Sequence, residues 1–484
     1  MLSYLKRLGK HAIIYSFGEF MYKGLALVFI PLYTRYLVPS EYGIIEIARA
    51  VGTILVIILP LGLDSALARY YFSFNKDKAE LKQFISTVFF GILITGIIAV
   101  LFFDLFGNLI FHYCFKDIPF NPYIRLTLFT SFCFLFPSTL LILLQIQEKS
   151  TQYVIFQLFQ AILMLGMILY FVVHLKAGAL GQIKARFIAT GSAAALSFFI
   201  FARYIKFSFI WKKYFDSLKY GLPITVHSMS WWVLILSSRF ILQRYVSLSE
   251  AGIYSLGQNI GMGMEIILSS FNKAWVPLLY STADTERPET FAKLTKYYLA
   301  IVVLIAFTLS LFSKEIIMLL TTKSYYRSHE IIPIIVLGYV FVGIYMMLTN
   351  QIFYKEKTHY ILFITPVSAT ISIILNFLLV PKYGMYGAAF ATMLSFGIFA
   401  FITYLFSNKV FPIPYEKKKI AMLIVLGIVL FFIQKYFLSN SYFIDIIIKL
   451  FSLVIFVAIL WFSSYLSKEE KVKFINKISL FSKK

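Results

Sequence analysis

Acidic residues, cysteine and histidine are all scarce in this chain of 484 residues. The two cysteines, Cys114 and Cys133, form no CxxC or Cys/His cluster, and the six histidines include no HExxH-type pair. These spacings give no indication of a metal site. The sequence therefore predicts no catalytic residue, no metal ion and no other cofactor.

Long polar segments are missing as well. The longest loops are predicted at about 107–123 and 280–292, and no linker of about 30 or more polar residues separates soluble domains. Catalysis outside the membrane usually needs a sizeable outer loop, and no loop carries a Ser/His/Asp or HxxxD-type signature. The loops therefore give no indication of an enzyme.

Apolar sequence dominates what remains. Hydrophobic residues make up 60% of the chain, and the mean hydropathy is +0.82. About fourteen apolar runs have the length of about 20 residues that a helix needs to cross a bilayer. They lie near 12–33, 43–63, 84–106, 124–146, 153–174, 185–205, 222–243, 252–279, 297–320, 331–353, 359–380, 386–408, 419–438 and 443–466. The sequence predicts an all-α integral membrane protein. Arg186 crowds the start of the sixth run, and His227 and Arg239 interrupt the seventh.

The basic residues are distributed unevenly. The 45 lysines and arginines outnumber the 22 aspartates and glutamates, giving a net charge of +23. With the N-terminus inside, roughly twice as many lysines and arginines fall in inner as in outer segments, which is the positive-inside pattern. The sequence thus predicts a multi-pass protein of the cytoplasmic membrane with both termini cytoplasmic. Anionic lipid explains the charge, and no nucleic acid partner is expected.

A segment of the chain occurs twice. Residues 35–44 read RYLVPSEYGI and residues 244–253 read RYVSLSEAGI, 209 positions later. Weaker echoes at similar offsets pair Glu148 with Glu356 and Gly178 with Gly384. We interpret this as a duplication into two parallel six-helix bundles, related by an axis along the membrane normal. The predicted parts are 1–211 (spans 1–6), 212–411 (spans 7–12) and 412–484 (two appended spans and a basic cytoplasmic tail).

Ionisable residues inside spans gather in the first two helices of each half. Charges at mid-membrane are costly, so they are expected to face a cavity or a partner. The cations Lys23, Arg49, Lys273 and Arg239 are candidates for binding an anionic headgroup, and the acids Glu19, Glu46, Glu265 and Asp64 are candidates for charge pairing or coupling. A simpler alternative is that Glu19–Lys23 and Glu46–Arg49 neutralise themselves on one helix face.

Several stretches resemble the oligosaccharide-lipid flippases, or polysaccharide biosynthesis proteins, of the superfamily that also holds lipid II flippases and multidrug extrusion transporters. They include PLYTRYLVPSEYG at 31–43, GLDSALARYY at 62–71, RFIL from Arg239, AWVP at 274–277, KEKT at 355–358 and NFLLVPKYG at 376–384. The resemblance covers about residues 12–409. It implies a V-shaped pair of six-helix bundles plus two extra spans.

The resemblance also implies a function. Such proteins move polyprenyl-diphosphate-linked sugars from the inner to the outer leaflet by alternating access, for surface polysaccharide biosynthesis. In the lipid II branch, cations on the first, second and eighth spans engage the diphosphate, and Lys23, Arg49 and Lys273 occupy similar spans. Where relatives often have Asp before the Arg-Phe of span 7, this chain has Ser238, which argues against an ion-coupling acid there.

A multidrug or cation antiporter of the same fold is the main alternative. Its pocket should be acidic or aromatic, whereas each candidate acid here has a basic neighbour. A membrane polysaccharide polymerase or acyltransferase is the least favoured alternative, because the loops are short and carry no catalytic signature. The expected partners are the lipid-linked oligosaccharide, the bilayer, and a polysaccharide polymerase and glycosyltransferases acting on the same glycan.

Overall fold

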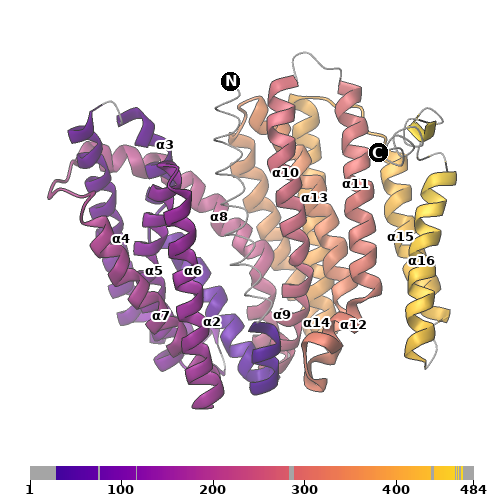
Figure 1. The fold of residues 1–484 in the computed structure, drawn as a ribbon, viewed down its shortest axis with the longest axis horizontal. Helices are drawn as coiled ribbons and strands as arrows, with labels where there is room; N and C mark the ends of the chain where they lie inside the picture. The colour runs from indigo at the N-terminus through magenta and orange to yellow at the C-terminus, as the bar shows by residue number, and fades with distance from the viewer. Residues whose placement is uncertain are drawn as a thin grey trace. The chain divides into compact units, whose positions relative to one another are not determined.

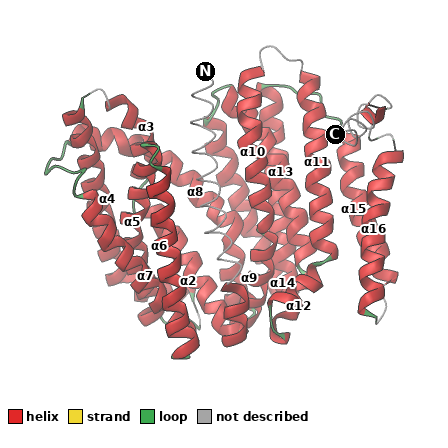
Figure 2. Cartoon of the chain, viewed as in Figure 1, coloured by secondary structure: helices red, strands yellow, loops and turns green. Residues whose placement is uncertain are grey.

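The computed structural model describes residues 29–74, 77–115, 117–282, 288–437, 441–463, 465, 467 and 470–472. All regular secondary structure in these residues is helical, and Figure 2 draws helices joined by loops. Nine of the described helices are long and apolar enough to cross a membrane, or ten if the bent pair α2 (Pro39–Ile58) and α3 (Leu63–Phe74) is one span. The prediction of an all-α multi-pass membrane protein is therefore confirmed. Glu19 and Lys23 lie outside the described residues.

The chain divides into two compact units. The first contains residues up to Leu256, together with Leu320–Arg327 and Ile361–Ser395. Its helices, in addition to α2 and α3, are α4 (Lys78–Cys114), η1 (Phe120–Ile124), α5 (Arg125–Ile146), α6 (Ser150–Ile168), η2 (Leu169–His174), α7 (Gly178–Phe201), α8 (Trp211–Tyr245) and the first part of α9 (Leu248–Gly261). Helices α2, α5 and α7 pack on one another, and α8 packs on α2, α3 and α4 (Figure 1).

Glycines lie at close approaches between helices of the first unit. Gly62 has a φ of +74° at the 40° bend between α2 and α3, and a Cβ there would overlap the backbone of Gly221 on α8. A Cβ on Gly43 of α2 would overlap the carbonyl oxygen of Leu248, and one on Gly252 of α9 would overlap that of Pro39. Small residues let helix backbones approach in this way inside membranes.

Two glutamates occupy matching places at two backbone turns. The Glu41 carboxylate lies against Gly178, where φ is +57°, and accepts a hydrogen bond from the Val38 N–H at 3.2 Å. The Glu250 carboxylate lies near Gly384, where φ is +55°, and pairs with Arg327 at 2.8 Å. A left-handed backbone favours glycine, which explains the residue type at both turns.

The second unit contains Gly257–Leu319, Ser328–Tyr360 and the residues from Phe396 onward. Its helices are α10 (Gly263–Thr282), α11 (Pro288–Leu311), α12 (Ser313–Leu320), α13 (Ile332–Tyr354), the end of α14 (His359–Val410), α15 (Lys417–Phe437) and α16 (Tyr442–Phe462). The short helix η3 (Lys323–Glu330) is divided between the units, and α14 bends at Gly384. Helix α11 is central, packing on α13, α15 and α16.

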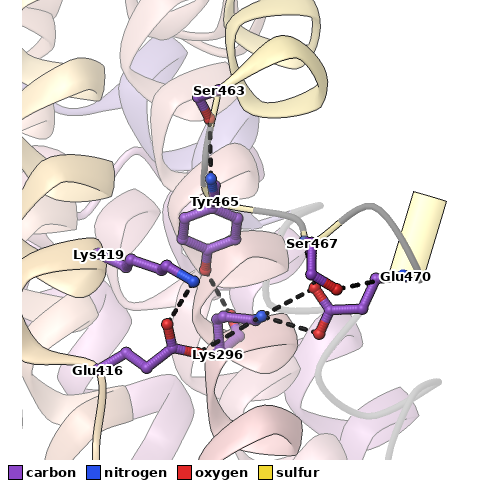
Figure 3. Close-up of polar contacts among 7 residues, drawn as sticks. All are labelled: Lys296, Glu416, Lys419, Ser463, Tyr465, Ser467 and Glu470. Atoms are coloured by element: carbon purple, nitrogen blue, oxygen red, sulfur yellow. Dashed lines mark hydrogen bonds and ion pairs between the residues drawn. The ribbon is translucent and has the colours of Figure 1, made fainter.

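Lys296, a buried lysine of α11, pairs with a glutamate in the segment that follows α16. The Lys296 side chain is 3% exposed, and its Nζ lies 2.9 Å from Glu470 Oε1 and 3.6 Å from Glu416 Oε1 (Figure 3). Tyr465 donates its hydroxyl hydrogen bond to the Lys296 carbonyl oxygen at 2.7 Å. We call Lys296, Glu416, Tyr465 and Glu470 the Lys296 cluster. It joins α11, the loop before α15 and the segment after α16.

A second buried pair acts on α16 itself. Lys449, within α16, is 4% exposed and lies 2.6 Å from Glu315 in the first turn of α12. Each ion would be costly to bury alone in an apolar environment. The Lys449–Glu315 pair therefore favours one position of α16 against α12, and the Lys296–Glu470 pair favours one position of the following segment against α11.

Candidate functional site

One carboxylate in the first unit is shared by two arginines. Glu46 of α2 lies 2.7 Å from Arg49 on the same helix and 2.6 Å from Arg239 on α8. Glu46 is 3% exposed and Arg239 is 0% exposed, whereas 40% of the Arg49 side chain remains accessible. We call these three residues the Glu46 triad. With two cations and one anion, it carries a net charge of +1.

The helix faces that carry the triad are fixed by a further contact. Trp232 of α8 donates its Nε1–H to the carbonyl oxygen of Ala50 on α2 at 2.9 Å. Ala50 is one helical turn beyond Glu46, and Trp232 is two turns before Arg239, so both contacts lie along the same α2–α8 seam. The indole and the ion pair together hold these helices in register.

A cavity of about 250 Å³ opens beside Arg49, between α2, α5 and α7. Its cationic lining residues are Arg49 and Arg186, and Gln182 adds an amide. Hydroxyl groups come from residues on all three helices: Thr53, Thr127, Thr130, Ser131 and Thr190. Ile45, Val56, Ile57 and Phe134 are among the residues that supply apolar wall. We call this space the α2–α5–α7 pocket.

Most of these hydroxyls already donate to their own helix. Thr127 donates to the Tyr123 carbonyl oxygen at 2.9 Å, and Thr130 donates to that of Leu126 at 2.6 Å. Ser131 donates to the Thr127 carbonyl oxygen at 2.8 Å. Since the proton is used within the helix, the hydroxyl oxygen is left with acceptor capacity. The pocket is therefore lined by the side chains of Arg49 and Arg186 and by hydroxyl oxygens on α5, and the Gln182 amide already donates to the Tyr33 hydroxyl at 3.4 Å.

The sequence predicted part of this arrangement. The pairing of Glu46 with Arg49 at i,i+3 is confirmed. Arg239 is also predicted to bind an anionic headgroup. In this structure its side chain is 0% exposed and pairs with Glu46 at 2.6 Å, so a ligand cannot reach it while that pair is intact. Asp64 accepts the Ser65 N–H at 2.8 Å in the first turn of α3.

Other candidate residues belong elsewhere. Lys273 and Glu265 lie on α10 in the second unit. Their sharing of one cavity with Arg49 stays a prediction, as do the roles assigned to Glu19 and Lys23. Ser238, which stands where related flippases often have Asp, is 1% exposed. Its hydroxyl lies 3.2 Å from that of Thr392, which lies 3.0 Å from the Tyr254 hydroxyl.

Sequence reasoning missed Arg186 as a functional candidate. Arg186 interrupts an otherwise apolar run, and an intramembrane arginine is itself a signal of a polar cavity. The buried lysines of the second unit, Lys296 and Lys449, gave the same kind of signal. Within the described ranges, no group of three or more His, Cys, Asp or Glu residues could hold a metal ion.

Comparison with solved structures places the fold. The lipid II flippase MurJ in an inward closed conformation matches with a TM-score of 0.74 at 18% identity, covering 93% of this chain and 99% of that one. An inward-facing multidrug resistance MATE family transporter of the MOP superfamily matches with a TM-score of 0.68 at 14% identity, covering 82% and 97%. The chain thus has a fold of the MurJ and MATE type.

Sequence comparison gives the family. An uncharacterized membrane protein of Haemophilus influenzae is 23% identical over 370 residues, which cover 75% of this chain and 88% of that protein. The sequence pattern of the family described as "Polysaccharide biosynthesis protein" matches residues 8–283, more than half of the chain. This protein is therefore a member of the polysaccharide biosynthesis protein family.

Proposed function

We propose that this protein is a flippase that moves polyprenyl-diphosphate-linked oligosaccharide from the inner to the outer leaflet of the cytoplasmic membrane. The observation that carries the proposal is the Glu46 triad, an intramembrane cation site whose accessible member, Arg49, opens on a polar pocket. Family membership supports a role in building a surface polysaccharide.

The task explains the need for such a site. A sugar-diphosphate headgroup cannot cross about 30 Å of hydrocarbon unaided, because its charges and hydroxyls would be buried without partners. Arg49 offers two parallel N–H donors that suit a phosphate oxygen pair. A phosphate that binds Arg49 competes with Glu46, whose charge Arg239 continues to balance. The triad can therefore exchange one anionic partner for another without leaving a buried charge unpaired.

We further propose fourteen spans built by duplication. The described helices fall at the predicted spans from the second onward, with α14 supplying two across its bend. Glu41 beside Gly178 and Glu250 beside Gly384 are equivalent contacts at sequence offsets of about 208, and Gly43 and Gly252 make reciprocal contacts at an offset of 209. Equivalent contacts at a constant offset support two parallel bundles, at 1–211 and 212–411, followed by appended spans in 412–484.

Transport by alternating access, with the protein taking no part in bond chemistry, is part of the same proposal. Glycosyltransferases would supply the lipid-linked glycan on the inner face, and a polysaccharide polymerase would consume it outside. A multidrug or cation antiporter is less well supported, because the triad has two arginines for one carboxylate and Arg186 adds a further cation nearby.

Flipping by the purified protein in liposomes tests the proposal. We expect Arg49→Ala to lower the rate of flipping a polyprenyl-diphosphate oligosaccharide at least tenfold, because a charge-assisted contact contributes about 1.5–3 kcal/mol. Arg49→Lys should keep part of the activity. The matched control is Arg125→Ala, which removes an exposed 2.8 Å pair with Asp104. Neither residue lines the pocket, so this variant should stay within about twofold of wild type.

Two results would count against the proposal. One is a wild-type protein that exchanges organic cations for protons or sodium but moves no lipid-linked glycan. The other is an Arg49→Ala variant that is present at wild-type level and flips the substrate at the wild-type rate.

A further inference from the structure

We propose that the first three turns of α8, residues 211–222, form a binding surface for anionic phospholipid at the membrane interface. We call these residues the α8 interface segment. Helix α8 has 35 residues, so at 1.5 Å per residue it is about 52 Å long. The hydrocarbon core is about 30 Å thick, and the seventh span is predicted at 222–243, so this segment lies where the helix leaves the hydrocarbon. The surface is separate from the Glu46 triad, and the inference does not depend on the proposed function.

One side of the α8 interface segment is packed on α3 and α4. Tyr214 is buried on this side. Lys213 lies 2.9 Å from Glu80 in the first turn of α4, and the Tyr220 ring lies 5.6 Å from that of Tyr70 on α3. These contacts fix the rotation of the helix about its axis, and they determine which side chains point away from the protein.

The outer side carries an apolar stripe. Trp211, Phe215 and Leu222 are 63%, 57% and 44% exposed. At about 100° per residue, the three side chains project within about 40° of one another. The Trp211 and Phe215 rings are stacked, with centroids 5.8 Å apart. Exposed aromatic side chains at the end of a span are typical of the boundary between headgroups and acyl chains.

Two lysines run beside the apolar stripe. Lys212 and Lys219 are exposed, and they lie two turns apart on nearly the same side of the helix, about 10 Å from each other along its axis. Within the described ranges, neither lysine forms an ion pair. Asp216 is the acidic residue of residues 203–219, which also contain five lysines and arginines, so this stretch has a net charge of +4.

This division of one helix surface fits an anionic lipid. A helix that lies at the interface turns aromatic and aliphatic side chains toward the acyl chains and lysines toward the headgroups. The two ammonium groups complement a headgroup whose net charge is negative, whereas a zwitterionic headgroup also presents a cation to them. Since α8 continues directly into the predicted span, one lipid can cover the stripe with its acyl chains and reach the lysines with its phosphate.

Quenching of Trp211 fluorescence tests the inference. The full-length protein is placed in nanodiscs of phosphatidylcholine and phosphatidylglycerol, with bromine on the acyl chains of one lipid at a time. Bromine quenches a tryptophan that it contacts, and Trp211→Phe gives the signal of the other tryptophans for subtraction. We expect brominated phosphatidylglycerol to quench Trp211 more strongly than brominated phosphatidylcholine at the same mole fraction.

Variants assign this preference to the lysines. One lysine near an anionic surface contributes roughly fivefold in binding, so Lys212→Gln combined with Lys219→Gln should remove most of the preference. Lys212→Arg combined with Lys219→Arg should keep it, because the charge remains. The matched control combines Lys184→Gln and Lys382→Gln, which remove the same charge from exposed lysines on α7 and α14, and it should keep the preference.

Equal quenching of Trp211 by the two brominated lipids in wild type would overturn the inference, as would a preference that survives the loss of Lys212 and Lys219. Absence of quenching by either lipid would also overturn it, because the stripe would then face water or protein. Inorganic phosphate, compared with chloride at the same ionic strength, separates a lipid from a free ion. If phosphate removes the preference where chloride does not, the lysines bind free phosphate and the assignment to lipid is wrong.

Discussion

Glu46 is the carboxylate that pairs with both Arg49 and the fully buried Arg239. Replacing it by glutamine should destabilise the fold by about 3–5 kcal/mol, because Arg239 is 0% exposed and would lose its counter-ion. Adding Arg239→Gln should restore part of the loss, since it removes the uncompensated charge. Unfolding of the purified variants in detergent measures both effects. Equal stability of Glu46→Gln and wild type would contradict an ionised triad.

The same residues show how far sequence reasoning reaches. Glu46 and Arg49 are three positions apart on a helix, so their pairing follows from periodicity alone. Arg239 is 193 positions from Glu46, and only the packing of α8 on α2 brings them together. Arg186 was visible as a charge in a span, but its pocket depends on how α7 meets α5. Charges inside spans are thus easy to find, and their partners are not.

At the scale of helices, the duplication predicts paired effects. Gly43→Ala and Gly252→Ala should each destabilise the protein by about 1–3 kcal/mol, because either Cβ would overlap a carbonyl oxygen of the facing backbone. The similar size of the two losses follows from their reciprocal contacts. Gly191→Ala in α7 is the control, with no atom near its Cβ, and should gain about 0.5–1 kcal/mol. Thermal unfolding compares the three, and a large loss at only one of the two glycines would weaken the duplication.

The Lys296 cluster predicts a dependence on acid. Burial alone would raise the pKa of Glu470, but hydrogen bonds from Tyr297, the Ser467 N–H and Lys296 outweigh it and lower the pKa to about 2. The pKa of Glu416 is also lowered, chiefly by its hydrogen bond with Lys419 and then by Lys296. A lowered carboxyl pKa stabilises the folded state above the unfolded value of about 4.3, and this stabilisation is lost as the pH falls toward 2.

Limited proteolysis of the segment after α16 measures this. In wild type, cleavage should be slow at pH 7 and should accelerate between about pH 4.5 and 2, as Glu470 and Glu416 take up protons. In Glu470→Gln it should already be fast at pH 7 and should vary less with pH. An acid-tolerant protease is needed, and an unstructured substrate cleaved in parallel corrects for its own pH profile. Identical profiles for the two proteins would show that Glu470 does not hold the segment.

At the scale of the whole molecule, membrane topology is the prediction to test. With both termini cytoplasmic, a single cysteine introduced at 75–82 should react with an impermeant thiol reagent only from inside, and one at 110–118 only from outside. Cys114 and Cys133 are replaced first, so that the background does not react. Labelling of both positions from the same side would refute the assignment, and labelling from the reversed sides would invert it.

The helical spans follow from hydropathy because length and apolar composition are local properties of the chain. Helices α8, α9 and α10 carry more polar residues and are not among the nine that satisfy both criteria. Helices α8 and α10 carry Arg239, Glu265 and Lys273, so three of the candidate functional residues lie where the span signal is weak. How two bundles pack depends on contacts between distant residues, which no local pattern encodes.

The buried pairs of the second unit have a consequence for biosynthesis. Lys296 and Glu315 enter the membrane region well before Lys449 and Glu470 have been translated, yet those later residues are their counter-ions. Until residues 449–470 leave the ribosome, α11 and α12 each hold an ion without its final partner. Assembly of this unit should therefore be completed late, and a ribosome stalled before residue 449 should leave a second unit open to quality-control proteases.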